Sequence, residues 1–118
     1  MNFCKLFLIF AEENNFMEIE FTQEYLRELY ENGCSTNKKY RFPKDIIKRY
    51  INTINKLRAA RRTEDLYSIK SLYYKKLSGD KKEIEAVRIN DKYRLEFISE
   101  VKGVITVCSI IEITNHYE

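Results

Sequence analysis

The chain has 118 residues, 44% of them hydrophobic and 14% aromatic, and a formal net charge of +3, which suits one small globular domain over residues 1–118 and leaves no room for a second. The cysteines Cys4, Cys34 and Cys108 are odd in number and far apart, a pattern that fits neither a disulfide framework nor the paired ligands of a zinc site. We therefore expect a cytoplasmic protein with no metal and no cofactor.

Residues 1–16 precede the first recognisable strand. The run from Phe3 to Phe10 is apolar apart from Lys5. It is too short to span a bilayer, and it has neither a basic leader nor a small-residue cleavage site. We expect no membrane association here. Either an upstream start codon or an extra strand accounts for these residues, which form a possible N-terminal extension.

One strand and two helices are predicted next. Residues 17–21 alternate as a strand does, and a helical period from Thr22 stops at Gly33, which offers a left-handed cap. Pro43 opens a second helix that runs to about Arg62. The apolar residues expected on its buried face are Ile47, Tyr50, Ile51, Ile54 and Leu57.

The second helix belongs to a strongly basic block. Residues 38–62 hold ten basic side chains and one acidic side chain, a local charge of +9, whereas residues 1–37 hold two basic and seven acidic ones. Such a block favours an anionic partner, with nucleic acid first and an acidic protein second. The alternative is a solvated helix face.

The remainder predicts an irregular connection over residues 63–72 and then an antiparallel meander. Its strands are expected at residues 73–77, 84–89, 93–99 and 104–113, with turns at 78–80, 90–92 and 102–103. The fold class is therefore α+β. Two N-terminal helices pack on an antiparallel-rich sheet of four to five strands.

The hydrophobic alternation predicts the register of one hairpin. The apolar faces of its two strands both reach the core only if Ile89 lies opposite Tyr93, across a three-residue loop. The same register puts Arg88 opposite Arg94 on the other face. Two like charges across a strand pair are unfavourable by about 0.2–1 kcal/mol unless an anion, or a carboxylate such as Glu96, lies between them. The arginine pair therefore predicts a phosphate site, and the alternative is two surface arginines in water.

The single histidine, His116, precedes Tyr117 at the end of the chain. An imidazole titrates near neutral pH, and a phenol with two guanidiniums can hold a phosphate. The tail therefore predicts acid–base chemistry on a phosphodiester. The alternative is a frayed terminal residue without a role.

Several of these segments, taken in order, resemble the RelE/ParE superfamily of bacterial type II toxins. Leu66 and the residues around 77–80 are most similar to the HigB (plasmid-killer) branch, and the terminal histidine and tyrosine to YoeB. The resemblance covers residue 17 to the end and implies a RelE-like toxin domain. The segments that carry it are Leu77-Ser78-Gly79, Arg88-Ile89, Tyr93-Arg94-Leu95 with Phe97, and His116-Tyr117.

The resemblance implies a ribosome-dependent endoribonuclease that cleaves messenger RNA and is silenced by a cognate helix-turn-helix antitoxin of the HigA type. It implies a catalytic set of Arg94, Arg88, His116 and Tyr117. The family's base position falls near Ser71, and its lysine position is Ser78. The residues expected to bind RNA or the ribosome are Lys75, Lys76, Lys81, Lys82, Arg58, Arg61 and Arg62.

Two other function classes stay open. A ParE-like member would poison DNA gyrase by binding, without nucleolysis. A non-catalytic nucleic-acid-binding module would need only the basic block, and its activity would survive loss of His116.

Overall fold

A computed structural model describes residues 17–77 and 83–115. The predicted turn at 78–80, Lys81, Lys82, His116 and Tyr117 lie outside the described residues, as does the apolar run in residues 1–16. Within the described residues, two α-helices, three short 3₁₀ turns and five strands follow one another. Their bounds are β1 (Glu18–Phe21), α2 (Glu24–Asn32), η1 (Lys38–Tyr40), α3 (Lys44–Ala59), η2 (Thr63–Ser68), η3 (Lys70–Leu72), β2 (Lys75–Lys76), β3 (Glu85–Arg88), β4 (Tyr93–Lys102) and β5 (Ile105–Asn115).

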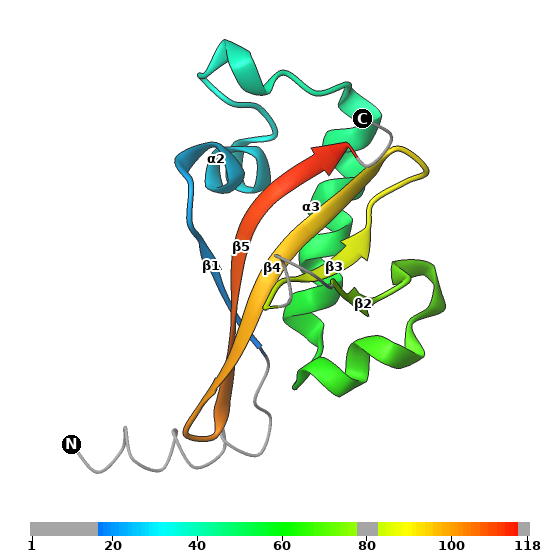
Figure 1. Cartoon of the computed structure of the whole chain (residues 1–118). Helices are drawn as coiled ribbons and strands as arrows, with labels where there is room; N and C mark the ends of the chain where they lie inside the picture. The colour runs from blue at the N-terminus through cyan, green and yellow to red at the C-terminus, as the bar shows by residue number, and fades with distance from the viewer. Residues whose placement is uncertain (1–16, 78–82, 116–118) are drawn as a thin grey trace, which may run out of the picture.

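The five strands form one mixed sheet in the order β1-β5-β4-β3-β2 (Figure 1). β1 runs parallel to β5, and the other three pairings are antiparallel. The predicted meander is confirmed, although β2 is only two residues long and the β4–β5 hairpin keeps pairing out to Lys102 opposite Ile105. The α+β class and the two helices packed on an antiparallel-rich sheet are likewise as predicted.

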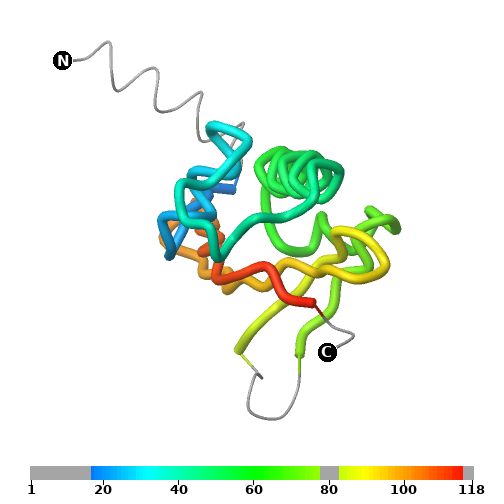
Figure 2. Tube along the Cα trace, turned by 90° about the horizontal axis from the view of Figure 1, so that it is seen from above, coloured from blue at the N-terminus to red at the C-terminus, as the bar shows by residue number. Residues whose placement is uncertain are grey.

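Both helices lie on one face of the sheet, which Figure 2 shows from above with α3 on one side of the strands. The core between the layers is apolar. It takes Leu26 and Leu29 from α2, Tyr50, Ile54 and Leu57 from α3, and Leu95, Phe97 and Ile110 from β4 and β5. The opposite face of the sheet therefore has no helix over it in the described part of the chain.

The buried face of α3 is turned slightly from the predicted one. Ile46 and Thr53 are buried, whereas Ile47 and Ile51 are only half-buried. Thr53 tolerates burial because its hydroxyl donates to the carbonyl of Arg49 at 2.8 Å, so no polar atom is left unsatisfied. The basic side chains predicted to lie off this face are all exposed, namely Lys44, Lys48, Lys56, Arg58, Arg61 and Arg62.

Hydrogen bonds join α2 and the residues just before it to α3 and to β5. The Tyr50 hydroxyl donates to the Leu26 carbonyl at 2.7 Å, and the Thr22 hydroxyl donates to the Ile110 carbonyl at 2.8 Å. The Ile113 amide donates to the hydroxyl of Tyr25 at 3.3 Å. Burial raises the pKa of Tyr25 to about 12, so this residue stays neutral at physiological pH.

Neither α-helix in residues 17–77 and 83–115 combines the length and the apolar character needed to cross a bilayer.

The end of α2 generates a stability prediction. Gly33 has a φ of +77°, and its amide donates to the Leu29 carbonyl at 3.1 Å. A Cβ there would meet nothing within 4 Å, so only backbone strain opposes a side chain. We expect Gly33→Ala to lower the unfolding free energy by about 1 kcal/mol, or Tm by about 4 °C, in a urea or thermal melt.

Gly33→Asn is the matched control, because asparagine enters the left-handed region more readily than alanine does. It should recover part of the loss. Equal losses for the two variants would mean that the added side chain, rather than the backbone conformation, causes the destabilisation.

Candidate functional site

The β3–β4 hairpin has the register predicted from the sequence. Arg88 lies opposite Arg94, and the Ile89 amide donates to the Tyr93 carbonyl at 2.9 Å. The side chain of Asn90 shapes the three-residue loop by accepting hydrogen bonds from the amides of Lys92 and Tyr93 at 2.9 and 2.8 Å. The two arginines therefore extend from the face of the sheet that is opposite the helices.

Each arginine has its own carboxylate. Arg94 Nη2 lies 3.1 Å from Glu96 Oε2, and its Nε donates to the Thr114 hydroxyl at 3.3 Å. Arg88 forms an ion pair with Asp91 of the hairpin loop. Glu96 thus compensates Arg94, and Asp91, which the sequence analysis overlooked, compensates Arg88. Because both guanidiniums are anchored, the like charges tolerate their cross-strand positions.

The pair of anchored arginines differs in burial. Glu96 is fully buried, and the Arg94 side chain keeps 23% of its surface exposed. The side chains of Arg88 and Asp91 are 36% and 79% exposed. Arg94 is therefore held in a drier and more rigid setting than Arg88. Its guanidinium has five N–H donors, and the contacts with Glu96 and Thr114 use two of them.

A hollow of about 440 Å³ opens beside the two arginines. Lys75 on β2 pairs with Ala86 and reaches the same side of the sheet. Three cations and one carboxylate line the hollow, so its charge favours an anion. Its lining residues are Tyr73, Tyr74, Lys75, Ala86, Val87, Arg88, Asp91 and Arg94.

The other predicted lysines are not brought into this hollow. Lys76 follows Lys75 on the strand, so it points to the opposite face and lines a separate hollow of about 320 Å³ with Glu83, Glu85 and others. Ser71, at the family's base position, instead accepts a hydrogen bond from Lys56 Nζ at 3.2 Å. Lys81 and Lys82 lie outside the described residues.

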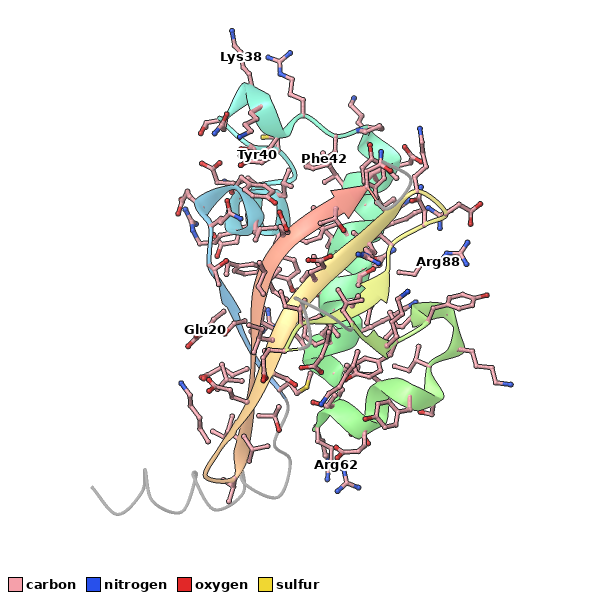
Figure 3. All side chains as sticks on the ribbon, viewed as in Figure 1. Glu20, Lys38, Tyr40, Phe42, Arg62 and Arg88 are labelled. Atoms are coloured by element: carbon pink, nitrogen blue, oxygen red, sulfur yellow. The ribbon has the colours of Figure 1, made fainter. Side chains whose placement is uncertain are left out.

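The arginine cluster at the end of α3 is a second, separate surface. Arg58 Nη1 donates to the Tyr30 hydroxyl at 3.1 Å on the helical side of the domain, and Arg62 lies 3.9 Å from Asp65. Figure 3 shows Arg62 well away from Arg88, and Lys38 at the far end of the molecule. The basic block is thus spread along η1, α3 and the start of η2 instead of forming one patch, and its arginines 58, 61 and 62 stay apart from the hollow.

The end of β5 borders the arginine pair. Thr114 lies opposite Arg94, and Asn115 lies opposite Tyr93. His116 and Tyr117 follow directly in the sequence. Their own positions lie outside the described residues, so their predicted role stays a prediction.

A buried polar cluster was missed by the sequence analysis. Glu85 is 3% exposed and accepts hydrogen bonds from the Tyr74 hydroxyl at 2.6 Å and from the Ser99 amide and hydroxyl at 2.9 and 2.7 Å. Burial and the neighbouring Glu85 carboxylate raise the pKa of Tyr74, which therefore stays protonated. The sequence contains one signal of this burial. Glu85 lies two residues before Val87 on the same strand, so both side chains point to the core side of the sheet. The cluster fixes the tyrosine that lines the hollow.

No metal site is evident in residues 17–77 and 83–115, where no group of three or more histidine, cysteine or acidic side chains is placed to hold an ion. Cys108 is buried, which raises the pKa of its thiol and makes it unreactive.

Comparison with known proteins identifies the fold. No family profile and no curated protein matches the sequence. Seven solved chains match the structure. A YoeB/ParE toxin from Agrobacterium tumefaciens has a TM-score of 0.53 and 13% identity, and the match covers 86% of this chain and all of that one. The conserved hypothetical protein HP0894 from Helicobacter pylori has a TM-score of 0.50 and 13% identity. That match covers 86% of this chain and 97% of HP0894. The chain therefore has a RelE/ParE-like fold.

The unequal burial of the two ion pairs generates a prediction. We expect Glu96→Gln to lower the unfolding free energy by about 2 kcal/mol, because it leaves the half-buried Arg94 without its charge partner. Asp91→Asn, in the exposed pair, should cost less than about 1 kcal/mol. Urea unfolding of both variants measures the difference. If Asp91→Asn costs as much as Glu96→Gln, the two arginines are held equally and Arg94 is not the more rigid one.

Proposed function

We propose that this chain is the toxin of a type II toxin–antitoxin system and cleaves messenger RNA on the ribosome. The observation that carries the proposal is the anion-favouring hollow formed by Lys75, Arg88 and Arg94 at the end of β5, from which the sequence continues into His116 and Tyr117. The fold supports it, since a protein described as a YoeB/ParE toxin matches over its full length. The HigB-like subtype rests on the sequence resemblance alone.

RNA cleavage of this kind needs three functions. The 2′-hydroxyl attacks the adjacent phosphate, so one group must accept its proton, another must protonate the departing 5′-oxygen, and cations must stabilise the charge that develops on the phosphate. Arg94, anchored by Glu96 and Thr114, is preorganised for the last of these functions. Arg88 and Lys75 extend the positive field across the hollow.

Two titratable residues of the hollow, Asp91 and Tyr74, are not suited to act as an acid–base pair at neutral pH. Asp91 forms an ion pair with Arg88, and the Tyr74 hydroxyl donates a hydrogen bond to Glu85 and has a raised pKa. We assign the acid–base role to His116, as the family resemblance implies, because an imidazole can accept and release a proton near neutral pH. Tyr117 would stack on a base or relay the proton.

The partners follow from the same proposal. A type II toxin is silenced by its cognate antitoxin, here expected to be a helix-turn-helix protein of the HigA type. The exposed arginines at the end of α3 offer a docking surface for ribosomal RNA or for an acidic antitoxin segment. That surface is separate from the hollow, so docking and cleavage should be separable by mutation.

A ParE-like gyrase poison is the second candidate. It is favoured by the carboxylate partners of both site arginines, which make the hollow less cationic than an arginine pair alone, and by the description of the Agrobacterium protein as YoeB/ParE. A supercoiling assay with purified gyrase separates the two. Inhibition of gyrase without any change in messenger RNA ends would favour this second function.

The hollow and the arginines at the end of α3 are separate surfaces, so mutations in each should have different effects. Arg94→Ala should reduce single-turnover cleavage by the fully bound ribosome complex while changing ribosome affinity little, because an interaction made chiefly in the transition state lowers turnover more than binding. Changing Arg58, Arg61 and Arg62 to glutamine should do the opposite. It should weaken ribosome binding and flatten its salt dependence, since fewer counterions are released.

Ribosome affinity at two salt concentrations and single-turnover cleavage are measured for both proteins. If Arg94→Ala loses binding as heavily as the triple variant and keeps its cleavage rate, Arg94 is a docking charge and the catalytic assignment of the hollow is wrong.

The terminal histidine carries its own prediction. His116→Ala should leave the thermal melt unchanged and lower messenger RNA cleavage by about 10²-fold or more, the usual scale for an acid–base group. Tyr117→Phe, which keeps the ring, should have a smaller effect. The readout is mapping of messenger RNA 5′ ends after induction at matched protein levels. Equal cleavage by wild type and His116→Ala would remove the histidine from the mechanism.

A further inference from the structure

Tyr73 stands out among the described residues in backbone and in exposure. It lies between η3 and β2 with φ +48° and ψ +49°, and in residues 17–77 and 83–115 it is the one residue other than glycine with a positive φ. Bulky side chains rarely adopt this left-handed conformation, which costs them free energy. Its side chain is also 63% exposed, so burial does not compensate for the strain.

The chain path requires the left-handed backbone here, but it does not require a tyrosine. The Tyr73 amide donates to the Lys70 carbonyl at 3.1 Å and ends the η3 turn. Glycine is the default residue for such an ending, as Gly33 is at the end of α2. A tyrosine at a position that favours glycine therefore indicates a functional role for its aromatic ring.

The ring is fixed in place by the site arginine. The guanidinium carbon of Arg88 lies 4.7 Å from the centre of the Tyr73 ring, at the distance of a cation–π contact. Asp91 holds the same guanidinium through an ion pair. Arg88 thus contacts both Tyr73 and Asp91, and Tyr73 presents a rigid and largely exposed aromatic surface.

This surface stands where two hollows meet. Tyr73, Arg88 and Asp91 line the hollow of about 440 Å³ that holds Lys75 and Arg94. The same three residues line a neighbouring hollow of about 510 Å³, which also contains Asp45, Arg49 and Ser71. A cation that can meet a phosphate therefore lies on each side of the tyrosine.

We propose that Tyr73 is a stacking residue for one base of a single-stranded RNA that passes from one hollow into the other. The inference rests on the proposed function and adds that the RNA bound at the hollow is single-stranded. Bases of a single strand expose their faces to aromatic side chains, and flanking cations follow the phosphates. In a duplex those faces are covered by neighbouring bases, so duplex RNA should not use this residue.

The test compares variants that separate the ring from the backbone. Tyr73→Gly removes the ring and relieves the positive φ, so the fold should be kept, and a thermal melt checks this. Tyr73→Phe keeps the ring. Tyr67→Ala is the matched control, because Tyr67 is 59% exposed but lies outside both hollows. The probe is a short single-stranded RNA that carries 2-aminopurine, whose fluorescence falls when it stacks, read at low salt.

Tyr73→Gly should weaken RNA affinity about fivefold or more and abolish the fluorescence change, the effect expected for loss of one base–aromatic stack. Tyr73→Phe and Tyr67→Ala should bind like the wild type. Replacing the stacked nucleotide by an abasic one should weaken wild-type binding but add no further loss to Tyr73→Gly, since both changes remove the same contact. Duplex RNA should not distinguish the variants.

Wild-type affinity and an unchanged fluorescence signal for Tyr73→Gly would overturn the stacking role. Ribosome-dependent cleavage separates this result from failure of the proposed function. If the wild type cleaves messenger RNA and Tyr73→Gly does so with the same KM and kcat, the toxin assignment stands and Tyr73 is only structural. If the wild type neither cleaves messenger RNA nor binds the single-stranded probe, the function and the inference fall together.

Discussion

In a β-hairpin, moving the pairing by one residue exchanges the two faces, and the β3–β4 hairpin carries core residues on one face and arginines on the other. Val87 and Leu95 pair on the side of the helices, where both are fully buried. A register slipped by one residue would bring the arginine of the shifted strand, Arg88 or Arg94, into the core at a cost of several kcal/mol. The same burial that stabilises the domain therefore fixes the geometry of the hollow, and the site needs no separate scaffold.

The two arginines of the hollow are held in different ways. Arg94 is anchored by a fully buried glutamate and a threonine on two central strands, whereas Arg88 is held by an exposed loop carboxylate and by an aromatic ring. A charge on a well-packed strand loses little entropy when it meets a developing negative charge. The side chain of Arg88, at 36% exposed, keeps more contact with solvent than that of Arg94.

Much of the fold and half of the site were predictable, because they depend on periodicity. Alternation in residues 84–97 gave the hairpin register, and the helical stripe with Gly33 gave α2 almost to the residue. Contacts that depend on segments without a hydrophobic period were not predictable. Tyr73 meets Arg88 only because of the path of η2 and η3, which have no sustained pattern, and the burial of Thr53 depends on a local hydrogen bond. Lys75 and Lys76 look equivalent in sequence, and only the pleat of a two-residue strand separates them.

The parallel pairing of β1 with β5 has a consequence for how the chain becomes a domain. Glu18 pairs with Val107, and Phe21 pairs with Ile110, so the first described strand finds its partner almost at the other end of the sequence. Such non-local contacts cannot form until loop closure brings distant segments together, which slows folding. During synthesis β1 stays without this partner until β5 has left the ribosome, because chains are made from the N-terminus. A nascent chain interrupted before β5 therefore lacks the strand that borders Arg94.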